Sequence, residues 1–195
     1  MIYICGDSFG VSDSEYGPCW VDYLKQHHDV VNLSQVGASN LLIAQQLDSV
    51  TNADFVIVLF TSSTRGQVRR GNRIVPFSLH RLDPTTTLND HELQILKAHT
   101  VEFFDLELAV YQNQLTIEAA LQRLVDQKQR FLFDQGGFEH PSFGAVGTNY
   151  FAKFNEYRSA YCLWDYALTR NLRPYYHIVD IDTHKMIAEY YARKA

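Results

Sequence analysis

The sequence predicts an α/β fold, in which a mostly parallel sheet of about five strands lies between two layers of helices. Short apolar runs with the length of buried strands alternate along the chain with stretches of helical periodicity. These runs are apolar on both faces, which is typical of parallel strands covered by helices on each side. The 195 residues are enough for one domain with a sizeable core, so a single domain is expected over residues 1–195.

The elements are expected to follow one another in the order that a three-layer α/β/α domain requires. Strands are expected at 1–5, 30–33, 55–60, 130–134 and 175–179, and helices at 19–24, 40–47, 98–129, 154–169 and 184–193. Residues 61 to about 100 break this rhythm, so we expect an irregular insertion or lid at about 64–98. Ligands of such sheets bind beyond the carboxyl ends of the strands, where the chemistry should therefore lie.

The charge balance argues against a nucleic-acid-binding module. The formal net charge is -5, whereas such a module normally presents a basic face. Four arginines do cluster at positions 65, 69, 70 and 73. We interpret them as one solvated loop, with a local anion site as the alternative.

The cysteines, histidines and apolar runs indicate the cellular compartment and whether a metal site is expected. Cys5, Cys19 and Cys162 are widely spaced, which suits a reducing compartment and does not indicate a metal site. His80, His91 and His99 are irregularly spaced, which also makes a poor metal site. No run resembles a signal peptide or a membrane span, so a cytoplasmic protein without membrane or nucleic-acid partners is expected.

A serine follows the first strand at the point where chemistry is expected. Gly6-Asp7-Ser8-Phe9 comes directly after residues 1–5. A serine acts as a nucleophile only if a turn exposes its hydroxyl and a base lies within hydrogen-bond reach. Gly6 allows a sharp turn, and a following helix would place its positive end near Ser8. The alternative is that Asp7 or Ser8 only caps a turn.

This tetrapeptide resembles block I of the SGNH (GDSL-type) hydrolases, which are serine esterases, lipases and carbohydrate deacetylases. Residues 32–39, Asn-Leu-Ser-Gln-Val-Gly-Ala-Ser, resemble block II of the same family. The resemblance extends unevenly over the whole length and implies a flavodoxin-like sheet with Ser8 as nucleophile. It also implies that the Ser8 and Gly37 amides bind the oxyanion, which agrees with the ability of a glycine to bring backbone N–H groups close.

The third block departs from the family pattern of Gly-x-Asn-Asp. The chain has Phe-Thr-Ser-Ser-Thr-Arg at 60–65, which resembles some phage-type members of the superfamily. There Ser62, or Thr61, could donate its hydroxyl to the oxyanion in place of the asparagine. The alternative is a hydroxyl-rich turn with Arg65 pointing to solvent.

The fifth block offers two registers for the catalytic base. Residues 184–188, His-Lys-Met-Ile-Ala, resemble a helix of the family in which that histidine is not the base. Asp180 would then cap the helix and His177 would be the base, the interpretation that we favour. In the other register His184 is the base, with Asp180 or Asp182 in the place of the family's aspartate. Neither register has Asp-x-x-His, and Asp180 is the candidate for the carboxylate that orients the imidazole.

Together these features predict hydrolysis of acyl esters through an acyl-enzyme on Ser8, for which no metal or organic cofactor is needed. The resemblance to the SGNH hydrolases implies an esterase or a carbohydrate O-acetylesterase. Candidate substrate contacts are Asp7, Thr61, Arg65 and His140. One alternative is a catalytically degenerate member of the fold that binds glycans or builds a virion, for which a second copy or a virion would be the partner. Another is a nucleotide-binding domain, against which the acidic Asp7, Asp13 and Glu15 argue.

Overall fold

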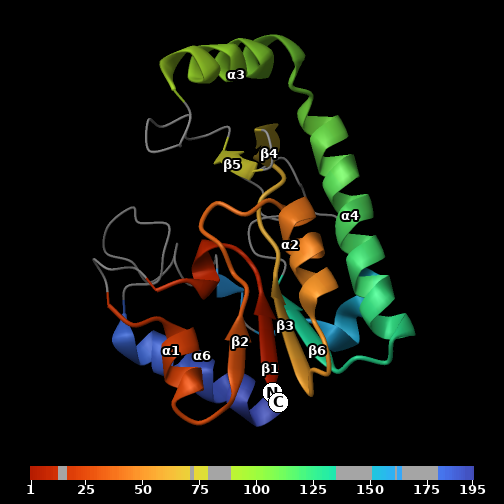
Figure 1. The fold of residues 1–195 in the computed structure, drawn as a ribbon. Coiled ribbons are helices and arrows are strands. Elements are labelled where there is room, and N and C mark those ends of the chain that lie inside the picture. The colour runs from red at the N-terminus through yellow and green to blue at the C-terminus, as the bar shows by residue number, and fades with distance from the viewer. Residues whose placement is uncertain (13–16, 71–72, 79–88, 135–150, 161, 164–179) are drawn as a thin grey trace.

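The computed structural model describes residues 1–12, 17–70, 73–78, 89–134, 151–160, 162–163 and 180–195. Its centre is a parallel sheet of four strands in the order β2-β1-β3-β6 (Figure 1). The strands are β1 (Ile2–Cys5), β2 (Val30–Asn32), β3 (Phe55–Leu59) and β6 (Phe131–Asp134). The bridge between Phe133 and Arg158 adds an extended segment beside β6. The predicted α/β fold with a parallel sheet is confirmed, and the expected strand at 175–179 lies outside the described residues.

One face of the sheet packs against α1 (Trp20–Lys25) and α6 (Ile181–Lys194). Alternate residues along a strand point to opposite faces, so every second strand residue joins this cluster. Its members from the sheet and the two helices include Ile2, Ile4, Ile57, Leu59, Leu132, Trp20, Leu24, Ile187 and Tyr191. The Trp20 and Tyr191 rings lie 4.9 Å apart between their centroids, which joins the two helices.

The other face packs against α2 (Asn40–Gln46) and α4 (Leu106–Asp126). The intervening strand residues form this second cluster, together with the 3-10 helix η4 (Ala152–Tyr157). Its members include Tyr3, Cys5, Val56, Val58, Phe133, Ile43, Ile117, Leu121 and Phe154. Two apolar clusters on opposite faces of one sheet make the three layers of the predicted α/β/α arrangement (Figure 1).

The described residues between β3 and α4 contain regular elements, so the expectation of an irregular insertion at about 64–98 is wrong. Arg65–Arg70 (β4) and Arg73–Ser78 (β5) pair as an antiparallel hairpin, and α3 begins at Asp90 and ends at Phe103. Asn89 caps α3 by accepting from the Glu92 amide, and Glu92 reaches back to the Asn89 amide. This capping box starts α3 at Asp90, before residue 98, where the insertion was expected to end.

Two of the expected helices differ from the structure in their extent. The helix expected at 98–129 is divided into α3 and α4, because Asp105 accepts a hydrogen bond from the Leu108 amide and caps a new helix there. The described start of the helix expected at 154–169 is the short 3-10 helix η4, which is followed by an extended Arg158. In the described part of the chain, the other short helices are η1 (Ser8–Gly10) and η2 (Leu47–Ser49).

Among the described residues, none of the helices combines the length and the apolar character needed to cross a bilayer.

Candidate active site at the carboxyl edge of the sheet

The turn after β1 holds Ser8 at the carboxyl edge of the sheet. Asp7 is the N-cap of η1, and its Oδ1 accepts a hydrogen bond of 3.0 Å from the Phe9 amide. Gly6 packs so closely on β3 that a Cβ atom there would lie 2.7 Å from Leu59 Cβ. A glycine is therefore required at position 6, and the Asp7 cap fixes the direction in which the chain leaves the strand.

The Ser8 hydroxyl is buried and has no hydrogen-bond partner among the described residues. The residue is 4% exposed, and its neighbours Asp7 and Phe9 are buried as well. Buried hydroxyl groups in proteins normally find a partner, so an unpaired one needs an explanation such as a catalytic role. The Ser34 and Ser63 hydroxyls share this property in the described part of the chain. Ser34 Oγ lies against Gly10, which gives it a packing role.

Asp7 also forms an ion pair across the site. Arg65 Nη1 lies 2.9 Å from Asp7 Oδ2, and the two side chains are 16% and 2% exposed. The pair joins the turn after β1 to the first residue of β4, which the sequence predicted only as two separate substrate contacts. Arg65 thus points toward the nucleophile turn, and the alternative that it points to solvent is wrong.

The turn after β2 approaches this edge through a glycine with a positive φ. Gly37 has a φ of 77°, a conformation that residues with a side chain rarely adopt. The Gln35 amide donates a hydrogen bond of 3.0 Å to the Gly6 carbonyl, and Asn32 Nδ2 donates one of 2.7 Å to the Gly10 carbonyl. These two bonds hold residues 32–37 beside the turn that carries Ser8.

Two side-chain amides of α2 hold the ends of β1 and β3, a feature that no motif of the sequence predicts. Gln46 Oε1 accepts from the Gly6 amide at 2.6 Å, and its Nε2 donates to the Gly6 carbonyl at 3.2 Å. Asn40 makes the same two-point contact with Thr61, at 2.8 Å in both directions. We call these contacts the amide clamps. Each satisfies a backbone N–H and C=O where the regular pairing of a strand ends.

The turn after β3 is built from hydroxyl groups. Thr61, Ser62, Ser63 and Thr64 are all buried. Ser62 Oγ accepts from the Thr64 amide at 3.2 Å and lies 2.8 Å from Thr64 Oγ1. These contacts hold the Ser62 oxygen in place. The Ser62 hydroxyl can donate its hydrogen bond either to Thr64 Oγ1 or to a group that enters the site.

The hairpin β4–β5 is attached to this edge at a second point. Ser39 Oγ donates a hydrogen bond of 2.8 Å to Gln67 Oε1 while it caps α2 by accepting from the Leu42 amide. Arg65 and Gln67 are two residues apart on β4 and therefore lie on one face of the strand. Figure 1 shows β4 and β5 beyond the carboxyl ends of the central strands.

Of the two candidate histidines, the structure describes His184, whereas His177 and His140 lie outside the described residues. His184 is buried in the first turns of α6, and its Nδ1 accepts a hydrogen bond of 3.2 Å from the Trp20 amide. Trp20 Nε1 in turn donates to the Phe9 carbonyl at 2.8 Å. His184 thus connects α6 to the start of α1.

Asp180 is the N-cap of α6, as the sequence predicts. Its Oδ2 accepts from the Thr183 amide at 2.8 Å and also contacts Thr183 Oγ1 at 2.5 Å. Within the described ranges, no group of three or more His, Cys, Asp or Glu side chains is placed to hold a metal ion.

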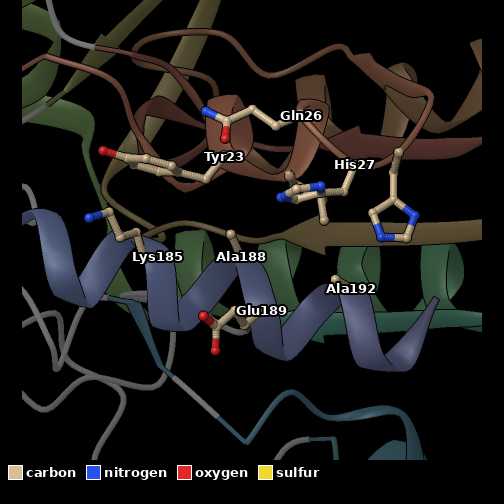
Figure 2. A pocket seen from close by; sticks show the side chains of 9 residues that line it. Tyr23, Gln26, His27, Lys185, Ala188, Glu189 and Ala192 are labelled. Atoms are coloured by element: carbon tan, nitrogen blue, oxygen red, sulfur yellow. The ribbon is translucent and has the colours of Figure 1, made fainter.

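A separate groove of about 270 Å³ lies between α1 and α6 (Figure 2). In it Lys185 Nζ lies 5.9 Å from the centre of the Tyr23 ring. Since α1 runs back toward the amino end of β2, its last residues and His28 are at the opposite edge of the sheet from Ser8. The groove is therefore not part of the Ser8 site. It is lined by Tyr23, Leu24, Gln26, His27, His28, Lys185, Ala188, Glu189 and Ala192.

No protein-family model matches the chain, and no curated protein matches it. Among solved structures, the lipase Lip_vut3 from a goat rumen metagenome is similar, with 15% sequence identity and a TM-score of 0.49. The match covers 100% of this chain and 96% of the lipase chain. At this identity and TM-score the likeness assigns neither a family nor an activity to the chain.

Proposed function

We propose that this chain is a serine hydrolase that cleaves acyl esters, including O-acetyl groups of carbohydrates, through an acyl-enzyme on Ser8. The observation that carries the proposal is the buried Ser8 hydroxyl, which has no hydrogen-bond partner in the described part of the chain. It follows β1 at the edge of a parallel sheet where ligands of such folds bind. The Asp7 cap, the Arg65 ion pair and the Gln46 clamp all hold the turn that carries it.

The proposed reaction has two steps. Ser8 Oγ attacks the ester carbonyl while a base takes the hydroxyl proton, and the bond to the alcohol breaks as that proton passes to the departing oxygen. Water then attacks the acyl-serine while the same base takes its proton, and the bond to Ser8 Oγ breaks as that proton passes to Oγ, which releases the acid and restores Ser8. Both steps pass through an oxyanion that needs hydrogen-bond donors.

The donors that we assign to the oxyanion are the amides of Ser8 and Gly37 and the hydroxyl of Ser62. Ser8 is the first residue of η1, where a backbone N–H has no partner within the helix. The positive φ of Gly37 supports a role in which its amide faces the site. When the Thr64 hydroxyl donates the hydrogen bond to Ser62 Oγ, the Ser62 hydroxyl can donate its own hydrogen to the oxyanion. We keep Thr61 as a substrate contact.

We assign the base to His177 and the orienting carboxylate to Asp180. The Trp20 amide needs an acceptor at His184 Nδ1, so the proton of a neutral His184 ring resides on Nε2. That nitrogen then has no lone pair to take the Ser8 proton. Asp180 caps α6 as the His177 register requires. His140 stays a proposed substrate contact.

The experiment is the hydrolysis of p-nitrophenyl acetate by the wild type and by Ser8→Ala, His177→Ala and His184→Ala. We expect Ser8→Ala and His177→Ala to lower kcat by about a thousandfold or more. His184→Ala should lower stability and keep most of kcat. The matched control is Ser34→Ala, since Ser34 is another serine at this edge with a buried, unpaired hydroxyl.

Three outcomes would contradict the assignment. If hydrolysis persists in Ser8→Ala, another group is the nucleophile. If the wild type hydrolyses no ester, the alternative of a binding or virion structural protein replaces the enzyme. Loss of activity in His184→Ala with a normal His177→Ala would transfer the base to His184.

A further inference from the structure

The hairpin above the Ser8 edge is strongly basic in a chain that is acidic overall. Residues 65–78 contain four arginines, Arg65, Arg69, Arg70 and Arg73, and no lysine, aspartate or glutamate. The formal charge of this segment is therefore +4, while that of the whole chain is -5. Such a local excess of one sign attracts ligands of the opposite sign to the surface that carries it.

Two contacts attach this hairpin near the nucleophile. Arg65 pairs with Asp7, the residue before Ser8, and Gln67 accepts a hydrogen bond from Ser39 at the start of α2. Both side chains lie on the face of β4 that is turned to the edge of the sheet. The hairpin is therefore attached beside the turn that carries Ser8, beyond the carboxyl ends of the central strands (Figure 1).

Arg65 retains hydrogen-bonding capacity beside the Ser8 turn. A guanidinium has five N–H donors, and Asp7 Oδ2 receives one of them at 2.9 Å. In the described part of the chain its other N–H groups have no partner, although the side chain is only 16% exposed. A planar guanidinium with unpaired donors is suited to a carboxylate.

We propose that the esters cleaved at Ser8 carry a carboxylate, which Arg65 binds at the base of the basic hairpin. This inference rests on the function proposed above and names its substrate class, an anionic ester. The charged group lies either in the acyl part, as in a dicarboxylic acid monoester, or in the alcohol part, as in an O-acetylated acidic sugar.

The experiment compares matched esters that differ in one charge. For the acyl side, p-nitrophenyl hemisuccinate is compared with its methyl ester, and for the alcohol side, 4-acetoxybenzoate is compared with its methyl ester. We expect kcat/KM to favour the anionic member of at least one pair by about tenfold or more, the size of one charge-assisted hydrogen bond. The pair that shows the preference identifies which part of the substrate carries the carboxylate.

Three variants test whether Arg65 causes the preference. Arg65→Gln should lower it to near one. The double variant Asp7→Asn/Arg65→Gln replaces the ion pair by two amides that can still bond to each other, and it should lose the preference equally. Arg193→Gln, which removes an exposed arginine of α6, should keep it. Each result is a ratio of two kcat/KM values for the same variant. A partial loss of folded protein lowers both values equally and leaves the ratio unchanged.

A preference near one in the wild type, or a preference unchanged in the double variant, would overturn the proposal. A second readout is independent of turnover. In Ser8→Ala, calorimetry should give a Kd for the hemisuccinate ester about tenfold lower than for its methyl ester. If the wild type hydrolyses neither ester, the proposed function fails, and these Kd values still test the anion preference.

Discussion

Arg65 Nη1 lies 2.9 Å from Asp7 Oδ2, so the residue that precedes Ser8 is paired with the first residue of the inserted hairpin. The Asp7 carboxylate is buried and holds the Phe9 amide with its other oxygen. One side chain therefore fixes the turn at the nucleophile and the position of the hairpin. Removal of either partner leaves a charge in a place with little access to water.

The first prediction concerns the stability of this pair. Arg65→Ala should lower the free energy of unfolding by about 3 kcal/mol, because it leaves the buried Asp7 unpaired. The double variant Asp7→Asn/Arg65→Gln should lose clearly less, which urea denaturation of both variants measures. If the double variant loses as much as Arg65→Ala or more, the two residues are not coupled in the folded chain.

The second prediction concerns the amide clamps. Asn40→Ala leaves the buried Thr61 N–H and C=O without the clamp, and Gln46→Ala leaves the Gly6 N–H without its partner, while the Gly6 carbonyl keeps the Gln35 amide. Each variant should therefore lower stability by about 1 to 3 kcal/mol. The matched control is Gln45→Ala, because Gln45 is an exposed neighbour on the same helix and should change stability by less than about 0.5 kcal/mol. Equal losses in Gln45→Ala and Gln46→Ala would show that the clamp does not stabilise the fold.

The sheet could be predicted from the sequence because its strands are short apolar runs with clear ends. The predicted runs 1–5, 30–33, 55–60 and 130–134 agree with β1, β2, β3 and β6 to within one residue at each end. Asp180 was predicted as the cap of α6 from the helical pattern that follows it. Local signals of this kind need only a few neighbouring residues.

The contacts that assemble the site could not be predicted in the same way. In the sequence, Asn40 and Gln46 are ordinary polar positions of an amphipathic helix. Their partners, Thr61 and Gly6, are distant in sequence. The hairpin was missed because its strands are rich in arginine and do not alternate between apolar and polar residues. Two local signals were present, the Gly71-Asn72 pair between the strands and the Asn89–Glu92 capping box.

The third prediction separates the two roles assigned to Asp180. Asp180→Asn keeps a good N-cap and should leave stability almost unchanged, whereas Asp180→Ala should lose about 1 kcal/mol. If the carboxylate orients the catalytic imidazole, both variants should lose kcat to a similar extent. Stability is measured by thermal unfolding and activity with p-nitrophenyl acetate. An Asp180→Asn variant with normal kcat would limit Asp180 to capping.

The fourth prediction concerns Cys5, which lies in the middle layer of the fold. Burial raises the pKa of its thiol from 9.0 to about 12, an effect that Arg123 only partly offsets. At pH 8 a thiol reagent should therefore modify the partly exposed Cys162 before Cys5, as peptide mass mapping would show. Rapid labelling of Cys5 in the folded chain would contradict this.

The same thiol gives a pH dependence of stability. The folded chain holds the Cys5 proton more tightly than the unfolded chain, so unfolding releases it above pH 9. Its contribution is complete below pH 9 and is lost as the pH rises toward 12. Cys5→Ala should therefore show a shallower alkaline loss of stability than the wild type in denaturant titrations. Equal slopes in the two proteins would contradict the assignment.

The most direct test of the central claim is the covalent labelling of Ser8 by a fluorophosphonate, followed by intact-mass and peptide analysis. A fluorophosphonate reacts with a serine whose hydroxyl is activated and whose developing oxyanion is stabilised. The proposed function predicts one adduct per chain on the peptide that contains Ser8, no adduct in Ser8→Ala, and a normal adduct in Ser34→Ala. An unlabelled wild type, or an adduct that persists in Ser8→Ala, would contradict it.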